Sequence, residues 1–480
     1  MAVRIAVLAA YVILIAVIGI SRMKKTRTFA DFFLGGGRVG PWMTAFTYGA
    51  AYFSAVLFIG FAGKVGWGFG YSGLWIALGN ALVGVLAVWA LIGFRIKRMS
   101  QEMSVTTMPE FLEKRYGSRF LKLFAGLATF VFFIPYSAAV FIGLSYLFKM
   151  NFNIEYWQAL AFMGLLTAFY LVLGGYRSMT VLDVVFGALM LAGGTVLFVS
   201  LLGKAGGMAA ATAKLAAIDP RLVGAVGPPG WWPLAALIFL TSVAPFGMPQ
   251  LVQKFYAVRD KKAVRAGMII STLFAVILSG IAYFAGGLTR LFLSPEATPG
   301  AFAGGKPVFD ALMPELLARV VPQSLTILML LLILSASMST LAALVLVSSS
   351  AVVKDLYGGF LRPAASDKTL TALMRCMSAL FVLLSVLLAY IRPATIVTIL
   401  GISWGAVGSV FLGPFLWGLL SKRATKAGAV AASLLALAVC LTLYFRGMPS
   451  PEAGTIGMLV SLAVPLIFIG FGPRRHRDNK

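Results

Sequence analysis

The stretch LILSASMSTLAALVLVSSS, residues 332–350, is apolar enough to lie in a lipid bilayer and yet carries seven hydroxyl groups. An apolar run of about 18 residues or more crosses the roughly 30 Å hydrocarbon layer as a helix. Such runs recur along all 480 residues, of which 60% are hydrophobic and 11% are charged. Backbone groups in lipid must be satisfied internally, and these runs are too long for barrel strands. We therefore expect an all-α polytopic membrane protein.

Thirteen membrane-spanning helices are predicted from these runs. They cover residues 3–20, 41–63, 71–94, 121–148, 156–174, 181–203, 233–256, 264–288, 323–353, 368–391, 393–419, 425–445 and 454–472. No appended soluble domain is expected between them. The stretches 204–232 and 289–322 are rich in Gly, Ala and Pro, and we expect them to form short surface helices or lids.

The formal net charge of +25 is better explained by a membrane than by nucleic acid. If the first loop is cytoplasmic and the loops then alternate, 29 of the 40 lysines and arginines fall on the cytoplasmic side. This bias follows the positive-inside rule. It predicts a multi-pass cell-membrane protein with its N-terminus outside and its C-terminus in the cytoplasm. Neither a nucleic-acid partner nor an obligate protein partner is expected.

Ionisable groups are rare inside the predicted spans. Of the fifteen acids, only Asp183 falls within a span rather than in a loop, a tail or a span end. A carboxylate in lipid is costly, which favours a functional role for it. The alternative is an interfacial acid that reaches toward Arg177. The single histidine, His476, lies in the C-terminal tail, so no acid–base pair is evident for an intramembrane enzyme.

Two spans are predicted to be interrupted at mid-depth. The second contains AFTYGAAYFSAVLFIGF, with Gly49 among small residues, and the seventh contains FLTSVAPFGMPQLVQ, with Pro245, Gly247 and Pro249. Proline removes a backbone donor and breaks a helix. Broken helices in corresponding positions of two halves indicate a substrate site near the midplane. The alternative is that glycine and proline are simply common in membrane helices.

The hydroxyls of the opening stretch also permit two interpretations. Ser335 and Ser339 are four residues apart and share a helix face, and Thr340 follows directly. Hydroxyls in membrane helices usually bond to their own helix or join neighbouring helices. If they face the carbonyls freed by a broken helix, they instead complete a neutral oxygen cage for a hard cation such as sodium.

Several segments resemble the sodium:solute symporter family, in the right order and over nearly the whole chain. They are FADFFLGGGRVGPW, SAVLFIGFAG, GGYRSMTVLD, ASMSTLAALVLVSSSAVVKDLY and GPFLWGLLSKRATKAGAVAA. A further segment, GMPQLVQKFYAVRDKKAVRAG, resembles the proline, pantothenate and monocarboxylate branches. The resemblance implies a leucine-transporter-like inverted repeat of five plus five helices. The implied parts are an extra helix and cytoplasmic loop at 1–40, repeats at 41–203 and 233–419, an extracellular loop at 204–232, and two helices with a basic tail at 420–480.

The resemblance also implies site residues. Sodium would be held by carbonyls of Ala50, Phe53 and Ala336 and by hydroxyls of Ser339 and Thr340. Asp183 matches the family aspartate close to the inward ion path. Pocket walls are expected at Tyr52, Phe53, Phe58, Tyr136, Ser137, Phe246, Gln250 and Trp404. The chain departs from the family at Tyr52, where some branches carry Asp, and at Phe186, where Gln is often found.

The expected function is sodium-coupled import of a small organic solute by alternating access, without enzyme activity. Sodium supplies energy through its differential affinity for the two states of the carrier. Because the spans hold few amides, we expect a carboxylate, an amino acid or a pantothenate-like solute rather than a sugar. Two alternatives are a proton-coupled transporter that uses Asp183 and a transporter-like membrane sensor. The absence of a kinase-sized domain in this sequence argues against the sensor.

Overall fold

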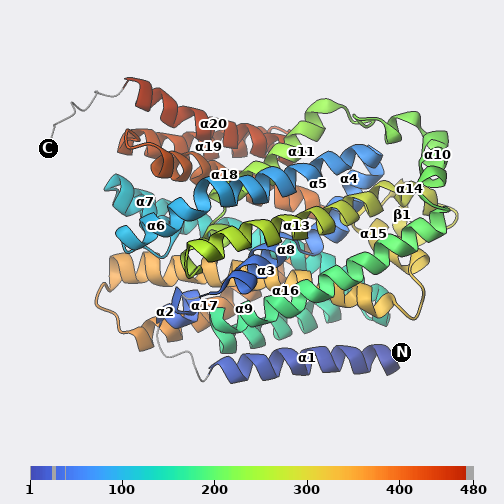
Figure 1. Ribbon diagram of the computed structural model, residues 1–480, viewed down its shortest axis with the longest axis horizontal. Helices are drawn as coiled ribbons and strands as arrows, with labels where there is room; N and C mark the ends of the chain where they lie inside the picture. The colour runs from blue at the N-terminus through green and yellow to red at the C-terminus, as the bar shows by residue number, and fades with distance from the viewer. Residues whose placement is uncertain (1, 24–28, 38, 472–480) are drawn as a thin grey trace.

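The computed structural model describes residues 2–23, 29–37 and 39–471, and these residues are almost entirely helical. Figure 1 shows one bundle of long helices that run along a common direction. The helices α6 (Phe94–Glu102) and α7 (Met108–Tyr116) lie at one end, which we name the basic end. The helices α10 (Met208–Ile218) and α15 (Phe309–Val320) lie at the opposite end, which we name the lid end. The lysines and arginines at 24–28 and in the tail from 472, which were predicted to be cytoplasmic, lie outside the described residues.

The remaining elements complete the bundle. The other long helices are α1 (Ala2–Met23), α8 (Arg119–Phe152), α9 (Tyr156–Ala205), α13 (Lys261–Gly287), α16 (Thr326–Ser350), α17 (Asp367–Ile391), α18 (Ile396–Leu420), α19 (Lys426–Phe445) and α20 (Ser450–Phe471). The shorter α-helices are α2 (Phe29–Leu34), α3 (Pro41–Tyr52), α4 (Ala62–Phe69), α5 (Leu74–Gly79), α11 (Trp231–Val243), α12 (Pro249–Ala257) and α14 (Thr289–Phe292).

Tighter and wider helical turns link these segments. The π-helical segments are η2 (Val56–Phe61), η4 (Asn80–Ala87), η5 (Trp89–Gly93) and η9 (Ala351–Leu361). The 3₁₀ segments are η1 (Gly35–Gly37), η3 (Gly70–Gly73), η6 (Pro220–Val223), η7 (Ala244–Gly247) and η8 (Pro299–Ala301). The strands β1 (Phe302–Ala303) and β2 (Lys306–Pro307) pair antiparallel. The two stretches predicted as surface helices or lids thus contain α10 and η6, and α14, α15 and this hairpin.

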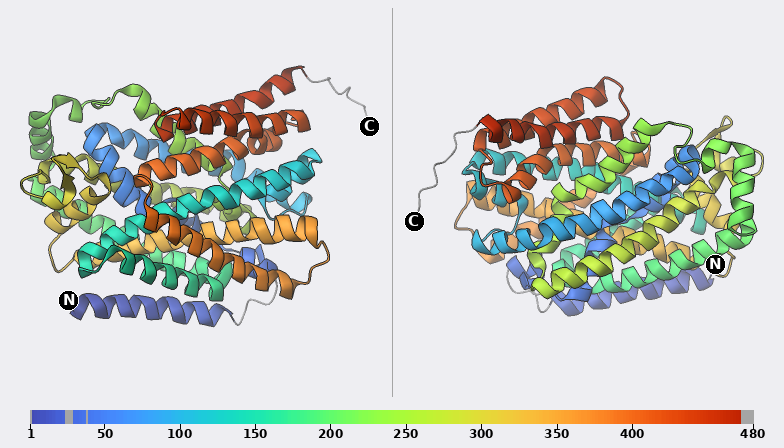
Figure 2. Two further views of the ribbon diagram at one scale, coloured as in Figure 1. Left: turned by 180° about the vertical axis from the view of Figure 1, so that it is seen from behind. Right: turned by 45° about the horizontal axis from the view of Figure 1, so that its top comes forward.

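Burial sorts the helices into a centre and a periphery. The helix α16 is buried without interruption from Met329 to Ser350, as expected for a helix that is apolar on every side. By contrast, α1 is largely exposed and packs mainly on α9. Both views in Figure 2 place α1 at the edge of the bundle, with α19 and α20 at the opposite edge. The hydroxyl-rich stretch from the sequence is therefore the core of the molecule.

The described residues contain ten helices long and apolar enough to span a membrane, or eleven if the bent pair of α11 and α12 counts as one span. The thirteen predicted spans differ from this count where helices join or break. The predicted spans 156–174 and 181–203 are the two arms of α9, which meet at a kink at Gly175 (φ 59°, ψ −165°), and the second arm is a span of its own. That positive φ favours glycine. The predicted span 41–63 is divided between α3 and the η2–α4 segment.

Both predicted interruptions are confirmed, one of them at a different residue. The helix α3 ends at Tyr52, and Phe53 is extended (φ −109°, ψ 126°). In the other span α11 ends at Val243, and Met248 is extended (φ −85°, ψ 114°) before α12 begins at Pro249. The first break therefore lies four residues beyond Gly49. Gly49 serves close packing instead, since a Cβ there would lie 2.6 Å from Cδ1 of Phe274.

Candidate sodium and substrate sites

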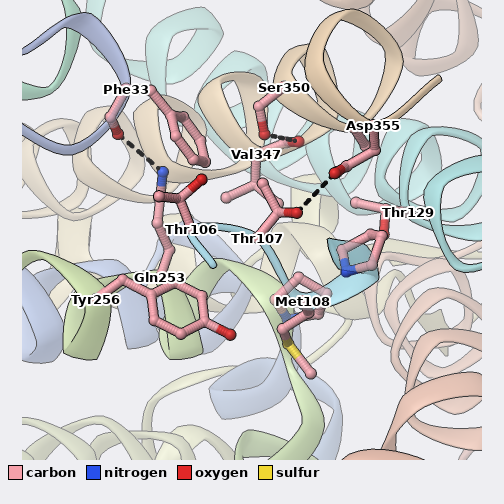
Figure 3. A pocket seen from close by; sticks show the side chains of 13 residues that line it. Phe33, Thr106, Thr107, Met108, Thr129, Gln253, Tyr256, Val347, Ser350 and Asp355 are labelled. Carbon is pink, nitrogen blue, oxygen red and sulfur yellow. Dashed lines mark hydrogen bonds between the residues drawn. The ribbon is translucent and has the colours of Figure 1, made fainter. Parts of the chain in front are cut away.

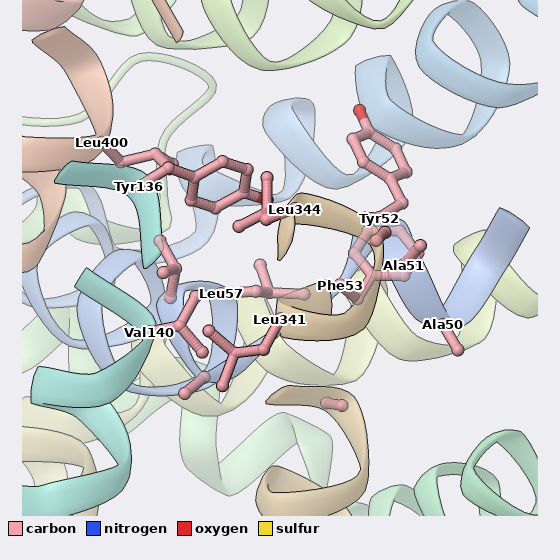
Figure 4. Close-up of a cluster of buried hydrophobic side chains, with 14 of the residues drawn as sticks. Ala50, Ala51, Tyr52, Phe53, Leu57, Tyr136, Val140, Leu341, Leu344 and Leu400 are labelled. Carbon is pink, nitrogen blue, oxygen red and sulfur yellow. The ribbon is translucent and has the colours of Figure 1, made fainter. Parts of the chain in front are cut away.

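The first break frees backbone carbonyls in the middle of the protein. The last carbonyls of an α-helix lack intrahelical partners. Because the Phe53 N–H still donates to the Gly49 carbonyl at 3.3 Å, the freed carbonyls are those of Ala50, Ala51 and Tyr52, with Phe53 following in extended conformation. Figure 4 shows Ala50 to Phe53 at this end of α3, near Leu341 and Leu344 of α16. Ala50 and Phe53, the two carbonyl ligands expected on α3, therefore flank the break that faces α16.

Hydroxyls of α16 hold both sides of this break. The Thr340 hydroxyl lies 3.2 Å from the Ala51 carbonyl and 3.1 Å from the Ala336 carbonyl of its own helix. The backbone N–H of Ala55 donates to the Ser337 hydroxyl at 3.1 Å. The structure thus brings Ala336 and Thr340 against the freed turn of α3. The contact falls on Ala51, between the two expected carbonyls.

The other hydroxyls of the stretch divide into joined and unpartnered groups. Ser335 shares a hydrogen bond with Tyr11 of α1 at 3.2 Å, and Ser349 accepts one from Ser378 at 3.1 Å. These two join helices, as the simpler interpretation predicts. Within the described part of the chain, the Ser339 and Ser348 hydroxyls are buried without a hydrogen-bond partner. Of these, Ser339 is the one that the resemblance assigns to sodium.

Asp183 lies beside this site and is fully buried. The hydroxyls of Thr47 and Ser339 are close to its carboxylate, and the positive charge of Lys254 attracts it. Neither carboxylate oxygen completes a hydrogen bond with the described residues. The alternative of an interfacial acid near Arg177 is wrong, because Arg177 donates to Asp31 at 2.6 Å while Asp183 is enclosed in the core.

The chemistry of these groups fits a small hard cation. The Thr47 and Ser339 hydroxyls and the Asp183 carboxylate are buried oxygens without partners in the described residues, and freed carbonyls lie close by. Broken helices that expose carbonyls are a recurrent way to coordinate sodium. No group of three or more His, Cys, Asp or Glu side chains suited to another metal occurs among the described residues.

A small cavity lies next to the same break. Its volume is about 30 Å³. Four of the expected pocket residues line it, namely Tyr52, Phe53, Tyr136 and Trp404. The rings of Tyr52 and Trp404 stack at 6.1 Å, and Tyr136 packs edge-on against Trp404 at 5.8 Å. A volume of this size holds one or two waters, so these rings must separate to admit an organic solute.

The other four expected pocket residues do not line this cavity. They are Phe58, Ser137, Phe246 and Gln250. Each of the first two is adjacent to a lining residue, Leu57 or Tyr136, and successive helical side chains diverge by about 100°. The lining residues not anticipated are Ser54, Val56, Leu57, Phe61, Asn80, Thr241, Tyr283 and Leu400. Asn80 could have been found, because it is one of few amides within a predicted span.

The cavity also connects the two broken helices. The Tyr52 hydroxyl donates to the Thr241 carbonyl of α11 at 2.5 Å. Asn80 accepts from Ser242, the next residue of α11, at 3.2 Å. Polar groups from α3, η4 and α11 therefore converge on one point between the breaks, where a solute could contact both.

Polar contacts close the lid end above the cavity. The Asp310 carboxylate of α15 accepts from the first backbone N–H of α18, at Ile396, at 3.2 Å. Lys64 lies with its ammonium 5.7 Å from the ring of Phe309. Burial raises the pKa of Asp310 to about 6, although the Ile396 hydrogen bond and the charge of Lys64 act in the opposite direction. The lid helix α15 is thus fastened directly to α18.

A second set of contacts closes the basic end. Thr107 donates to Asp355 at 2.7 Å, and Lys354 pairs with Glu110 at 2.8 Å, which ties α7 to η9. Burial pushes the pKa of Glu110 upward, but the charge and hydrogen bond of Lys354 outweigh it and hold that pKa below its usual value. Figure 3 shows Thr107 and Asp355 in contact, with Gln253 bonded to the Phe33 carbonyl nearby. The cavity left among them is only about 10 Å³.

The fold has a close counterpart among solved structures. A Na⁺-coupled sialic acid symporter, solved in a substrate-bound outward-open state, superposes with a TM-score of 0.82. The two chains are 20% identical, and the match covers 98% of each. The expected leucine-transporter-like fold class is confirmed.

Sequence comparisons give the family directly. The model of the sodium:solute symporter family matches residues 32–436. The osmoregulated proline transporter OpuE of Bacillus subtilis is 30% identical, over 92% of this chain and 88% of its own. The sodium/pantothenate symporter of Escherichia coli is 31% identical, over 89% and 88%. With its two broken helices, the chain belongs to the sodium:solute symporter family and is a multi-pass, sodium-coupled solute transporter, not an enzyme.

Proposed function

We propose that this protein imports a small carboxylate or amino acid, driven by sodium bound where the first break meets residues 336–340. The observation that carries this proposal is the contact of Thr340 with the freed Ala51 carbonyl, beside the unpartnered Ser339 hydroxyl. Ala50, Phe53 and Ala336 supply further carbonyls at the same point. Asp183 lies next to Ser339 and provides a charged position on the route of the ion.

The lining of the cavity supports a compact solute with few hydroxyls. Its polar side chains come mainly from Ser54, Asn80 and Thr241, whereas aromatic and aliphatic groups cover the rest. A sugar needs several directed hydrogen bonds, which such a wall supplies poorly. The relatives include proline and pantothenate transporters, and both of those solutes carry a carboxylate. The positive ends of half-helices can hold a carboxylate without a charged side chain.

Coupling follows from what each substrate contacts. Sodium between α3 and α16 would replace the hydrogen bond between Thr340 and Ala51 and fix the two helices together. Solute entry requires the rings of Tyr52 and Trp404 to separate on the lid side. Exit requires the contacts of Thr107 with Asp355 and of Lys354 with Glu110 to open. A carrier that can open at one end only at a time performs alternating access.

The proposal includes an orientation in the cell membrane. Among the described residues, most lysines and arginines belong to segments predicted to be cytoplasmic, such as 95–122 and 254–265, and the positive-inside rule assigns the basic end to the cytoplasm. The lid end then faces outward, with α1 beginning there and α20 ending in the cytoplasm. We also retain the division into a leading helix at 1–40, repeats at 41–203 and 233–419 joined by the loop 204–232, and a closing helix pair at 420–480.

Uptake into proteoliposomes tests this function. Labelled proline and pantothenate are supplied with an inward sodium gradient, and with a proton gradient in sodium-free buffer. We expect uptake of one such carboxylate with sodium only, and its loss in the Ser339→Ala, Thr340→Ala double variant. Ser433→Ala is the matched control, since that buried hydroxyl bonds to the Val410 carbonyl away from the site. Unchanged uptake in the double variant rejects the site, and uptake driven by protons alone supports the proton-coupled alternative.

A further inference from the structure

Lys254 is a buried cation to which the transport mechanism above gives no role. It lies in α12, directly after the second break, and is only 1% exposed. Its ammonium lies 3.7 Å from the sulfur of Met179 and 5.2 Å from the ring centroid of Tyr176. A thioether and an aromatic ring are weak partners for a desolvated charge, which is costly to bury unless an anion compensates it.

The compensating anion is Asp183. Met179, Tyr176 and Asp183 all belong to α9, so Lys254 packs against the helix that carries the carboxylate. The Lys254 ammonium contacts Met179, one helical turn before Asp183, so the two opposite charges attract each other within the core. Asp183 nevertheless lacks a hydrogen-bond partner in the described residues. The two charges therefore balance across a gap rather than in a contact ion pair.

Other nearby cations are engaged elsewhere. Arg177, on α9, pairs with Asp31, and Lys97 of α6 bonds to the Tyr256 carbonyl at 3.4 Å. Lys254 is on a flexible stem and carries a compact charge, so its ammonium can approach or leave Asp183 without backbone motion. The helix α12 is also set at an angle of 41° to α11, so a small change at the bend moves Lys254 relative to α9.

The position of sodium determines what this arrangement does. The Ser339 hydroxyl belongs to the proposed sodium site and also neighbours Asp183. When sodium is bound there, Asp183 faces both sodium and Lys254, and sodium alone balances its charge. Without sodium, Asp183 would be a buried, uncompensated charge if Lys254 were absent. The same carboxylate is thus shared by the transported ion and by a side chain of the protein.

Resting on the proposed sodium site, we propose that Lys254 is the internal cation that takes the place of sodium beside Asp183 in the empty carrier. It competes with sodium, which promotes release into the cytoplasm. It also neutralises Asp183 while the unloaded carrier returns to the outward-open state. Lys254 is thus a positioning residue for Asp183 and does not itself contact the solute.

The test compares sodium binding with two modes of transport in full-length protein. In Lys254→Met, sodium-dependent thermal stabilisation should reach half its maximum at a sodium concentration on the order of tenfold lower, a usual size for coupling between sites. Net uptake should fall severalfold, because the empty carrier returns slowly. Solute exchange with high sodium on both sides should persist, since a loaded carrier needs no internal cation. Lys254→Arg, which keeps the charge, should restore part of the net uptake.

Lys97→Met is the matched control, because it also removes a buried lysine at the basic end but not one facing Asp183. Its sodium affinity should equal that of the wild type. Absence of any sodium effect on the wild type would overturn the proposed function. A normal sodium response in the wild type, with unchanged affinity and equal loss of uptake and exchange in Lys254→Met, would overturn only the role of Lys254.

A second variant covers the case in which Lys254→Met does not fold. The double variant Lys254→Met, Asp183→Asn removes both charges and leaves no unpaired ion in the core. It should recover folding, measured as a monodisperse species with a cooperative thermal transition. If it also fails to fold, the balance between Lys254 and Asp183 is not what stabilises this region, and the proposal is rejected.

Discussion

The two broken helices reach similar shapes by different physical means. At the first, neither of the two residues of the break is proline or glycine: Phe53 and Ser54 separate α3 from η2, and hydroxyls of α16 bond to the backbone on both sides. At the second, Pro245 lies within the short segment η7, Pro249 begins the next helix, and Gly247 of η7 packs against the backbone of α18 at Leu412. The first break depends on its neighbour, and the second depends on its own sequence.

This difference assigns each break a separate task. A conformation held by hydroxyl contacts can change when an ion competes for those hydroxyls and carbonyls. A conformation imposed by proline stays the same whether or not an ion is bound, because it follows from the covalent structure of the residue. We infer that the first break changes conformation when sodium binds. The second break keeps its conformation while the first one moves. The hydrogen bond from Tyr52 to the Thr241 carbonyl connects the two.

The largest expected loss of stability comes from adding a side chain at Gly247, the glycine of the second break. A Cβ on Gly247 would lie 2.8 Å from the Leu412 Cα, and neither backbone can withdraw easily. Gly247→Ala should therefore destabilise the protein by about 1–3 kcal/mol through overpacking. Thermal unfolding in detergent, followed by tryptophan fluorescence, measures the loss.

Gly49→Ala is the matched variant in the first broken helix. There the added Cβ would lie 2.6 Å from the buried ring of Phe274, a side chain that must shift, whereas alanine gains roughly 0.5–1 kcal/mol in a helix interior relative to glycine. We therefore expect a smaller loss of stability than for Gly247→Ala, whose added Cβ would meet backbone atoms. If Gly49→Ala costs as much as Gly247→Ala, the first break is packed as rigidly as the second, and the contrast between them fails.

The next effect concerns the hydroxyl that supports the first break. Ser337→Ala leaves the buried N–H of Ala55 without its partner, which costs about 1–3 kcal/mol. We also expect weaker sodium binding, because the break loses part of its support. The half-maximal sodium concentration for thermal stabilisation reports this directly.

Ser385→Ala provides the comparison, because that buried hydroxyl bonds only to the Phe381 carbonyl of its own helix. Removing it leaves no backbone donor unpaired, so stability and sodium affinity should stay close to wild type. Equal behaviour of the two variants would mean that α16 does not hold the first break.

The same contrast explains how much of the fold the sequence could predict. The second break was placed correctly because proline acts through its own covalent structure. The first was expected near Gly49 but lies at Phe53, since its position is set by Ser337 and Thr340 on a helix far away in the chain. The boundary predicted between the spans 156–174 and 181–203 is also close to the observed one, because α9 kinks at Gly175, whose positive φ favours glycine.

The candidate site also contains residues that the sequence could predict and residues that it could not. The segments that carry the residues predicted for sodium lie against each other, with Thr340 in contact with the Ala51 carbonyl, and it was the family resemblance that pointed to both segments. Half of the predicted pocket walls miss the cavity, because helical rotation decides which of two adjacent residues, such as Tyr136 and Ser137, points inward. Lys254 was counted as a cytoplasmic charge, and only packing reveals that it is buried against α9.

A smaller effect is expected from the bond between the breaks. Tyr52→Phe removes the hydroxyl that donates to Thr241 but keeps the ring that stacks on Trp404. The expected loss of stability is about 0.5–1.5 kcal/mol. Tyr48→Phe is its control: the lost bond to the Gly84 carbonyl is also buried but does not join the breaks. Solute should stabilise Tyr52→Phe more than the wild type, and not Tyr48→Phe, since only the former eases separation of the breaks.

The smallest effect sharpens the comparison most. Pro249 occupies the first turn of α12, where its missing N–H has no intrahelical role. Pro249→Ala should therefore cost only about 0.4–1 kcal/mol, mainly through a more flexible unfolded chain. The break should persist, because Pro245 and the packing of Gly247 remain, and sodium-driven uptake should stay near wild type. If Pro249→Ala stays folded but loses uptake, the second break depends on this one residue. The rigidity inferred for that break would then be wrong.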